Sequence, residues 1–574
     1  MMSRSWAWCA CLILWPTVTA AAADDKLWES IPDKAPIVFQ IKGVERVKER
    51  LTAMLEKGGP ETKALVAEAE ATLTLVLQDR KLAGMKADAR VYLAVVALPD
   101  PHTETGPEVA FFVQVQDYEA FRNGLLTEEQ RQSVKKADGI ETASLDEGDL
   151  FLGRRGDLVV VTQRRGIAAA FVEGADAHPL AKKLPQERAD LFNSRDLGIY
   201  INLELINKQY EQEIAMARSF LDMGMGQVGE LGGFPASAAD FFKSMFEGIL
   251  QAFIDSRLLI LSVDCEPEGV RAHLHMSFAS GSTTNKTLTG LSRRVALTDL
   301  ARLPAGMTAY QLGDYGNSWS TMALLSLGFL GSENAGVRAA QKAAVAELTL
   351  AEPAGFATAA RHIDYALYTW KFGNGALAEK ALNKLYGTLQ PGESYAMFLK
   401  LTKVEIAAEP VVHRGIQFRH IELGWSFADL PQEVVEALKA QMGSGFKAWM
   451  GVSGDRWLMA LGGDWDTARQ HIDRYLDESE TIGKLPGFES IANRLPAKAT
   501  LFSTGDMSYA LAQGMVGQGF RAPAKDPTAR EVRAADWYGF AIVIDPTELA
   551  VDLWLPVSGI AAVIEQAKRS LPDD

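Results

Sequence analysis

Two histidines, His273 and His275, have the spacing in this sequence that comes closest to metal chemistry. Alternate residues of a strand point to the same face, so both imidazoles would project together and offer two ligands to a metal ion. A metal site needs a third ligand, and Arg271, which falls on the same face, would repel a cation. The pattern therefore favours a solvated sheet face, and we expect neither a metal nor another cofactor.

Motifs of the common enzyme classes are missing from the sequence. It contains no G-x-x-x-x-G-K-[ST] phosphate loop, no H-E-x-x-H zinc motif and no C-x-x-C pair. The segment Gly451-Val452-Ser453-Gly454 resembles a nucleophile elbow, but its second glycine comes one residue early and precedes a strand instead of a helix. Cys265 stands beside acidic residues, which raise a thiol pKa and disfavour a nucleophile. We expect no catalytic residues.

The first 23 residues are typical of a secretory signal peptide. Arg4 supplies a positive charge, residues 6–18 form an apolar run too short to cross a membrane, and small residues suit cleavage near Ala22 or Ala23. Of the cysteines only Cys265 would remain, so the mature chain could form no internal disulfide, which fits a bacterial envelope compartment. No later stretch is long and apolar enough for a transmembrane helix. The sequence predicts an exported protein, periplasmic or secreted.

Charge and size restrict the partners and the number of domains. The formal net charge of −15 argues against a nucleic-acid partner and against electrostatic docking on anionic lipid. The chain of 574 residues exceeds what a single hydrophobic core supports. Its 48% hydrophobic and 23% charged residues are ordinary for globular proteins. We therefore expect more than one globular domain.

Short patterns occur twice along the chain, in the same order. Gly156-Asp157 and Gly454-Asp455 each stand as a turn before an apolar strand, and each strand leads through a second turn into a helix. Lys183-Leu184-Pro185 similarly matches Lys484-Leu485-Pro486. Several matches in one order indicate an internal repeat.

The repeats predict two homologous domains, residues 24–290 and 291–574, after the signal peptide at residues 1–23. Residues Val270 to Phe278 alternate between apolar and polar types, which predicts one strand of a hairpin near the end of the first domain. Strands joined by hairpins, with helices between them, give an α+β fold. Each domain is expected to be a mainly antiparallel sheet with packed helices.

The first repeat adds a helix, predicted from Ala238 to Ile254, whose large apolar residues form a broad stripe. A Gly/Met-rich stretch precedes it, and the second repeat has a similar stretch, which suits an adaptable flap over an apolar groove. The same stripe also suits a helix packed on the sheet. Trp554 alternates to the face opposite Leu553 and is a further candidate for a binding face. The candidate ligand-binding residues are Met223, Met225, Phe242, Met245, Phe246, Ile249, Phe253, Met515 and Trp554.

The repeated marks, FQIKG with YQLGD and GDLVVV with GDRWLM, resemble those of exported bacterial proteins of uncharacterised function that carry α+β domains in tandem. The resemblance covers most of the mature chain and implies the same tandem architecture. It brings no catalytic residues with it.

The sequence favours a non-catalytic exported envelope protein that binds an apolar ligand, either a lipid or acyl chain, or a hydrophobic protein segment. Two alternatives stay open. One is a structural or assembly protein that acts through contacts with an envelope protein partner or with its own copy. The other is a secreted hydrolase whose residues are brought together only by the fold.

Overall fold

The computed structural model describes residues 27–59, 83–100, 106–145, 148–174, 179–220, 236–314, 316, 332, 334–362, 365–395, 399–427, 432, 435–436, 439, 443–507 and 534–561, without the side chains of residues 236–242, 362, 395 and 534. The chain divides into two units. Unit 1 comprises Met1–Gln212 and Ser256–Ser277, and unit 2 comprises Glu213–Asp255 and Phe278–Asp574. The units differ in extent from the predicted repeats because residues 213–255 and 278–290 group with unit 2.

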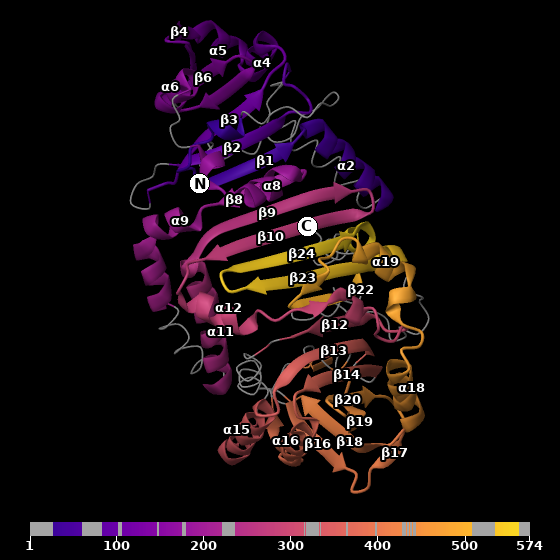
Figure 1. Ribbon diagram of the computed structural model, residues 1–574. Coiled ribbons are helices and arrows are strands. Elements are labelled where there is room, and N and C mark those ends of the chain that lie inside the picture. Colours follow the sequence, from indigo (N-terminus) through magenta and orange to yellow (C-terminus); the bar gives the residue numbers. More distant parts are fainter. Residues whose placement is uncertain are drawn as a thin grey trace. The chain divides into compact units, whose positions relative to one another are not determined.

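Unit 1 is built on an antiparallel sheet (Figure 1). Its strands are β1 (Ile37–Lys42), β2 (Arg90–Ala97), β3 (Glu108–Gln114), β4 (Lys135–Ala137), β5 (Ile140–Leu145), β6 (Gly148–Arg155), β7 (Leu158–Thr162), β8 (Leu197–Ile201), β9 (Ser256–Glu266) and β10 (Gly269–Phe278). They lie in the order β4–β5–β6–β7–β3–β2–β1–β8–β9–β10. Every residue of β7 is buried, as expected for an apolar, β-branched strand covered on both faces.

Helices cover both faces of the unit 1 sheet. On one face, α2 (Val44–Lys57) and α4 (Tyr118–Leu125) pack their apolar sides against β1, β2, β3 and β7. On the other face, α6 (Arg165–Glu173), α7 (Leu180–Lys183) and α8 (Gln186–Ser194) build a second core. The remaining short helices are η1 (Trp28–Ser30), α5 (Glu128–Ser133) and α9 (Leu203–Gln209).

Unit 2 also contains an antiparallel sheet. Its strands are β12 (Ala309–Gly313), β13 (Pro353–His362), β14 (Tyr365–Phe372), β15 (Ser394–Tyr395), β16 (Leu399–Ile406), β17 (Val411–His413), β18 (Ile416–Phe427), β19 (Gly445–Ser453), β20 (Arg456–Leu461), β22 (Leu501–Asp506), β23 (Trp537–Asp545) and β24 (Glu548–Pro556). A small separate pair joins β11 (Val295–Ala296) to β21 (Lys498–Ala499).

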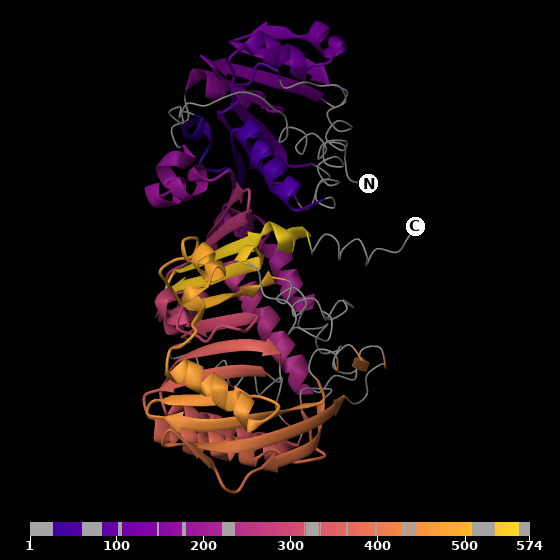
Figure 2. The same cartoon turned by 90° about the vertical axis from the view of Figure 1, so that its right-hand side faces the viewer.

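The helices of unit 2 again lie on both faces of its sheet. On one face α18 (Trp465–Leu476) and α19 (Pro486–Ala492) each contribute to a core of their own, and on the other face α15 (Ala335–Thr349) and α16 (Gly375–Gly387) share one core. The others are α11 (Ala236–Asp255), α12 (Thr283–Leu291), α13 (Leu297–Leu300), η3 (Ile482–Lys484) and η6 (Ala534–Asp536). Figures 1 and 2 both show α11 and α18 on different sides of unit 2.

The two units arrange their strands in the same order. In unit 2 the order β17–β18–β19–β20–β14–β13–β12–β22–β23–β24 repeats, strand for strand, that of unit 1 from β4 to β10. Unit 2 adds β15 and β16, which pair beside β18, where unit 1 has α5. The two units thus share a strand order, and their descent from one repeated domain stays a prediction.

The repeated Gly-Asp pair forms the same turn in both units. Gly156 has φ +66° in the two-residue loop between β6 and β7, and Gly454 has φ +62° in the loop between β19 and β20. A glycine with positive φ at the first loop position is the pattern of a type II′ hairpin turn. The Asp157 carbonyl accepts a hydrogen bond from Val115 N at 2.8 Å, and the Asp455 carbonyl accepts one from Phe372 N at 2.8 Å. The pair therefore ties each hairpin to the strand beside it.

An α+β fold on antiparallel sheets is thus confirmed for this chain. Within the described part of the chain, none of the helices combines the length and the apolar character needed to span a bilayer.

Candidate functional site

The predicted helix of the first repeat forms as α11, two residues longer at its start and one at its end. Alanine, methionine, leucine and glutamine along it favour the helical state. Met245, Phe246, Ile249 and Phe253 occupy positions i, i+1, i+4 and i+8, which lie on one side of a helix. All four are exposed: Phe246 keeps 42% and Ile249 60% of its surface accessible. The helix therefore presents an apolar stripe to its surroundings.

A second helical segment, residues 211–220, carries further exposed apolar residues. Met216 and Phe220, four residues apart, are exposed on it. The sequence interpretation missed both residues, although their i, i+4 spacing was the available signal. We use the name "apolar arm" for the exposed residues Met216, Phe220, Met245, Phe246, Ile249 and Phe253.

Polar contacts hold the opposite side of α11 to the rest of unit 2. Arg218 Nη2 donates to Gln251 Oε1 at 2.8 Å, and Gln251 Nε2 donates to Asp255 Oδ1 at 2.9 Å. The Asp255 Oδ2 accepts a hydrogen bond from Thr284 N, at the first turn of α12, at 2.8 Å. Burial alone would raise the pKa of Asp255, but the bonds from Thr284 and Gln251 outweigh it and lower that pKa. A charged Asp255 thus fixes the base of α11 and leaves the apolar stripe exposed.

For four of the predicted ligand-binding residues the structure describes either no position or no side chain. Met223, Met225 and Met515 lie outside the described residues. Phe242 lies within α11, but its side chain is outside the description.

Trp554 does not lie on an exposed binding face, so that expectation is wrong. It is 3% exposed and packs in the core of unit 2 with Phe488 and Ile491 of α19. The Arg494 guanidinium lies 3.9 Å from the centre of its ring, a cation–π contact that closes this side of the tryptophan. Strand alternation assigned Trp554 to the correct face, but α19 covers that face.

The expectation that the two histidines of β10 lie on a solvated face is also wrong. His275 is buried, with 1% of its surface exposed, and His273 is half-buried. Among the described residues no group of three or more His, Cys, Asp or Glu is placed to hold a metal ion. Burial, and then the carboxylates of Asp196 and Asp264, raise the pKa of the Cys265 thiol to about 11, which keeps it protonated.

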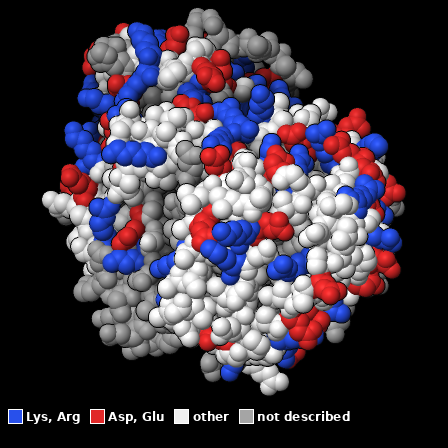
Figure 3. Space-filling model, turned by 60° about the horizontal axis from the view of Figure 1, so that its bottom comes forward, with Lys and Arg blue, Asp and Glu red and all other residues white. Residues whose placement is uncertain are grey.

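Neither the face of the molecule shown in Figure 3 nor a small cavity in unit 2 suits a larger polar ligand. On the face shown in Figure 3, Lys and Arg are scattered among Asp, Glu and uncharged residues, without a continuous basic field. A cavity of about 30 Å³ lies between α16 and the strands β18 and β19, lined in part by Tyr386, Met450 and Trp457. It has room for a water-sized group and is too small for an acyl chain.

Comparison with known proteins gives only distant similarity. No protein-family model matches the chain, and no curated protein matches it. The crystal structure of TP0453 in crystal form III shares 14% sequence identity over 46% of this chain and 83% of that chain, with a TM-score of 0.23. Crystal form I of TP0453 gives the same identity and TM-score over 46% of this chain and 82% of that one. At this TM-score the similarity carries no argument about fold or function.

Proposed function

We propose that this protein is a non-catalytic envelope protein, exported through its N-terminal signal peptide, that binds a lipid or acyl chain through the apolar arm. The observation that supports the proposal most directly is the exposure of Met245, Phe246, Ile249 and Phe253 on one side of α11. Contiguous apolar surface is costly in water and usually marks a site that a partner covers.

The types of side chain in the apolar arm also support an acyl-chain ligand. Methionine and phenylalanine contribute three of the four exposed residues on α11, and Met216 and Phe220 add two more nearby in the chain. Methionine adapts its shape to a flexible ligand, and phenylalanine contributes a large contact area. Neither requires a hydrogen-bonding partner in the ligand.

The first test is the native mass of the mature protein purified from an envelope fraction. Bound lipid should appear as additional mass that organic extraction removes. A dimer without extractable lipid would instead assign the apolar arm to the interface of an assembly protein. A monomer without lipid would contradict a stable lipid complex.

The second test replaces Phe246 by aspartate and measures binding of a fluorescent long-chain fatty acid. Because Phe246 is substantially exposed, the Phe246→Asp variant should fold like the wild type. Loss of one buried phenylalanine contact, about 1.5–3 kcal/mol, should weaken binding by about tenfold or more. Leu350→Asp is the matched control because Leu350 is an exposed apolar residue elsewhere in unit 2. Equal binding by the wild type and by Phe246→Asp would contradict the proposal, and unfolding of Phe246→Asp would place the helix in the core.

A further inference from the structure

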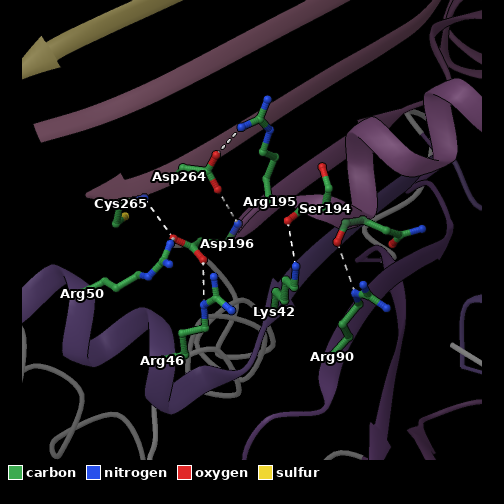
Figure 4. A network of polar contacts seen from close by, with 10 residues as sticks. Lys42, Arg46, Arg50, Arg90, Ser194, Arg195, Asp196, Asp264 and Cys265 are labelled. Carbon is green, nitrogen blue, oxygen red and sulfur yellow. Dashed lines mark hydrogen bonds and ion pairs between the residues drawn. The ribbon is translucent and has the colours of Figure 1, made fainter. Parts of the chain in front are cut away.

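A cluster of charged residues in unit 1 lies where β1, α2, α8 and β9 meet (Figure 4). At its centre is Asp196, which is 1% exposed. Arg50 Nη1 lies 2.8 Å from Asp196 Oδ2, and Arg46 Nε lies 3.5 Å from Asp196 Oδ1. Both arginines come from α2, one turn apart, and retain 45% and 37% side-chain exposure for Arg46 and Arg50. Asp196 therefore orients two arginine side chains that remain partly exposed.

Three further cations complete the cluster. Lys42 Nζ donates to the Ser194 carbonyl at 2.9 Å, and Arg90 Nε donates to the Asn193 carbonyl at 3.2 Å, both at the C-terminal end of α8. Cations are favourable there because the last carbonyls of a helix carry partial negative charge. Arg195 pairs with Asp264.

Positive charge exceeds negative charge in the cluster. Burial, followed by Arg90 and Arg46, lowers the pKa of Lys42, while Asp196 and Asp264 act in the opposite direction. The cluster as described contains five cations, Lys42, Arg46, Arg50, Arg90 and Arg195, and two carboxylates, Asp196 and Asp264, which both pair with arginine. An anion placed beside the cations would relieve their repulsion.

The fold does not require these charges, because unit 2 makes the same backbone connections without them. Lys42 N donates to Asp196 O, and correspondingly Asp314 N donates to Thr500 O. Cys265 N donates to Asp196 Oδ2 at 3.0 Å, and Ile544 N donates to Thr500 Oγ1 at 3.1 Å. A threonine hydroxyl thus accepts the hydrogen bond for which unit 1 uses an aspartate.

The neighbouring positions of unit 2 are also without cations. Strand register and these bonds place Asp314, Gly355, Ala499 and Val543 where unit 1 has Lys42, Arg90, Arg195 and Asp264. The cluster is therefore a property of unit 1 beyond the shared fold.

We propose that Lys42, Arg46 and Arg50 bind a phosphate group, either as free phosphate or as the phosphoryl group of a larger ligand. Guanidinium groups match the oxygens of phosphate in a forked geometry, and a lysine adds a point charge. Asp196 acts as the positioning residue because it holds both arginines without itself meeting the anion. The site would select doubly charged phosphate over singly charged anions.

The test is calorimetric titration of the mature full-length protein with inorganic phosphate and, separately, with glycerol phosphate. Saturable binding is expected at constant ionic strength, and a preference for one of the two ligands distinguishes free phosphate from a phosphate ester. The double variant Arg46→Gln/Arg50→Gln should lose about tenfold or more in affinity, the effect of removing charge-assisted hydrogen bonds. Circular dichroism confirms that it is folded.

The matched control, Lys48→Gln/Lys57→Gln, removes the same charge from the same helix and should keep its affinity within about twofold. If both double variants lose affinity equally, binding is a general charge effect and the proposed site is wrong. If the wild type shows no saturable binding of either ligand, the proposal fails as well. Should the arginine variant not fold, Lys42→Gln provides the same comparison with the control.

Discussion

Units 1 and 2 hold their chains together with the same backbone bonds but place different side chains beside them. Unit 1 has Asp196 immediately before β8, and unit 2 has Thr500 immediately before β22. Each side chain accepts a hydrogen bond from a backbone N–H of the neighbouring strand, Cys265 of β9 or Ile544 of β23. The topology therefore depends on an acceptor at this position and not on its charge. Side chains that differ between the units at such positions are not required by the fold and can therefore bind a ligand. The charge cluster of unit 1 is the main example.

The apolar arm lies in a chain connection that can also be compared between the two units. Along the chain, residues 211–220 and α11 lie between β8 and β9, two strands of the unit 1 sheet. The corresponding connection in unit 2 is the chain between β22 and β23. Both segments connect corresponding strands of their units. The shared strand order thus accommodates a long connection at this place, where β8 and β22 already pair with β1 and β12.

The largest effect is expected from removing the core aromatic residue that distinguishes the end of unit 2. Trp554, six residues into β24, corresponds to His275, six residues into β10, and both are buried. Trp554→Ala should destabilise unit 2 by about 3–5 kcal/mol because a large cavity forms beside α19. His275→Ala should destabilise unit 1 by about 2 kcal/mol, since a smaller ring is removed.

Hydrogen exchange read separately on β22–β23 and on β8–β9 measures the two units within one sample. Each substitution should reduce amide protection in its own unit. Unchanged protection of β22–β23 in Trp554→Ala would show that the tryptophan does not support the core of unit 2.

The sequence was sufficient to predict the α+β fold and the two Gly-Asp turns, since these depend on local chemistry, while the homology of the two domains stays a prediction. Gly156 and Gly454 mark turns because their positive φ suits glycine, and the apolar run after each one becomes a buried strand. The helix α11 and the hairpin of β9 and β10 were predictable for the same reason, because their periods of apolar residues are local.

The environment of a face was not predictable. Alternation of residue types predicts which face of β24 each side chain occupies, but not whether that face is exposed. Helices cover both faces of these sheets, so a residue on either face can be buried. The charge cluster was missed because its residues come from distant parts of the chain, Lys42 to Arg50, Arg195 with Asp196, and Asp264, which meet only through strand order.

An intermediate effect is expected from pH on unit 2. His471 of α18 is buried against Tyr365, with ring centres 4.2 Å apart, and burial lowers its pKa from 6.5 to about 4. Between these values the unfolded chain binds a proton that the folded unit does not, so stability falls as pH decreases from 6.5 toward 4. At pH 5 the loss relative to pH 7 is about 2 kcal/mol from this group.

Unfolding of unit 2, followed by hydrogen exchange at pH 7 and pH 5, measures this loss. His471→Phe keeps an aromatic ring and should reduce the pH dependence. The lowered pKa of His420, caused first by its burial, leaves a smaller slope of the same sign in that variant. An identical slope in the wild type and in His471→Phe would assign the pH dependence to other groups.

The smallest effect on the free energy of unfolding is expected from replacing Asp196 of unit 1 by threonine, the residue at the corresponding position 500 of unit 2. Asp196→Thr keeps an acceptor for Cys265 N, while Arg46 and Arg50 lose their counter-charge but remain accessible to water. The free energy of unfolding should therefore fall by only about 1 kcal/mol. Asp196→Val removes the acceptor as well and should cost about 1 kcal/mol more, the contribution of one buried hydrogen bond.

Equal costs for the two variants would show that the charge, and not the shared hydrogen bond, stabilises this position. A fully stable Asp196→Thr protein with weakened phosphate binding would instead separate the two roles, since the hydrogen bond maintains the fold and the carboxylate orients the arginines.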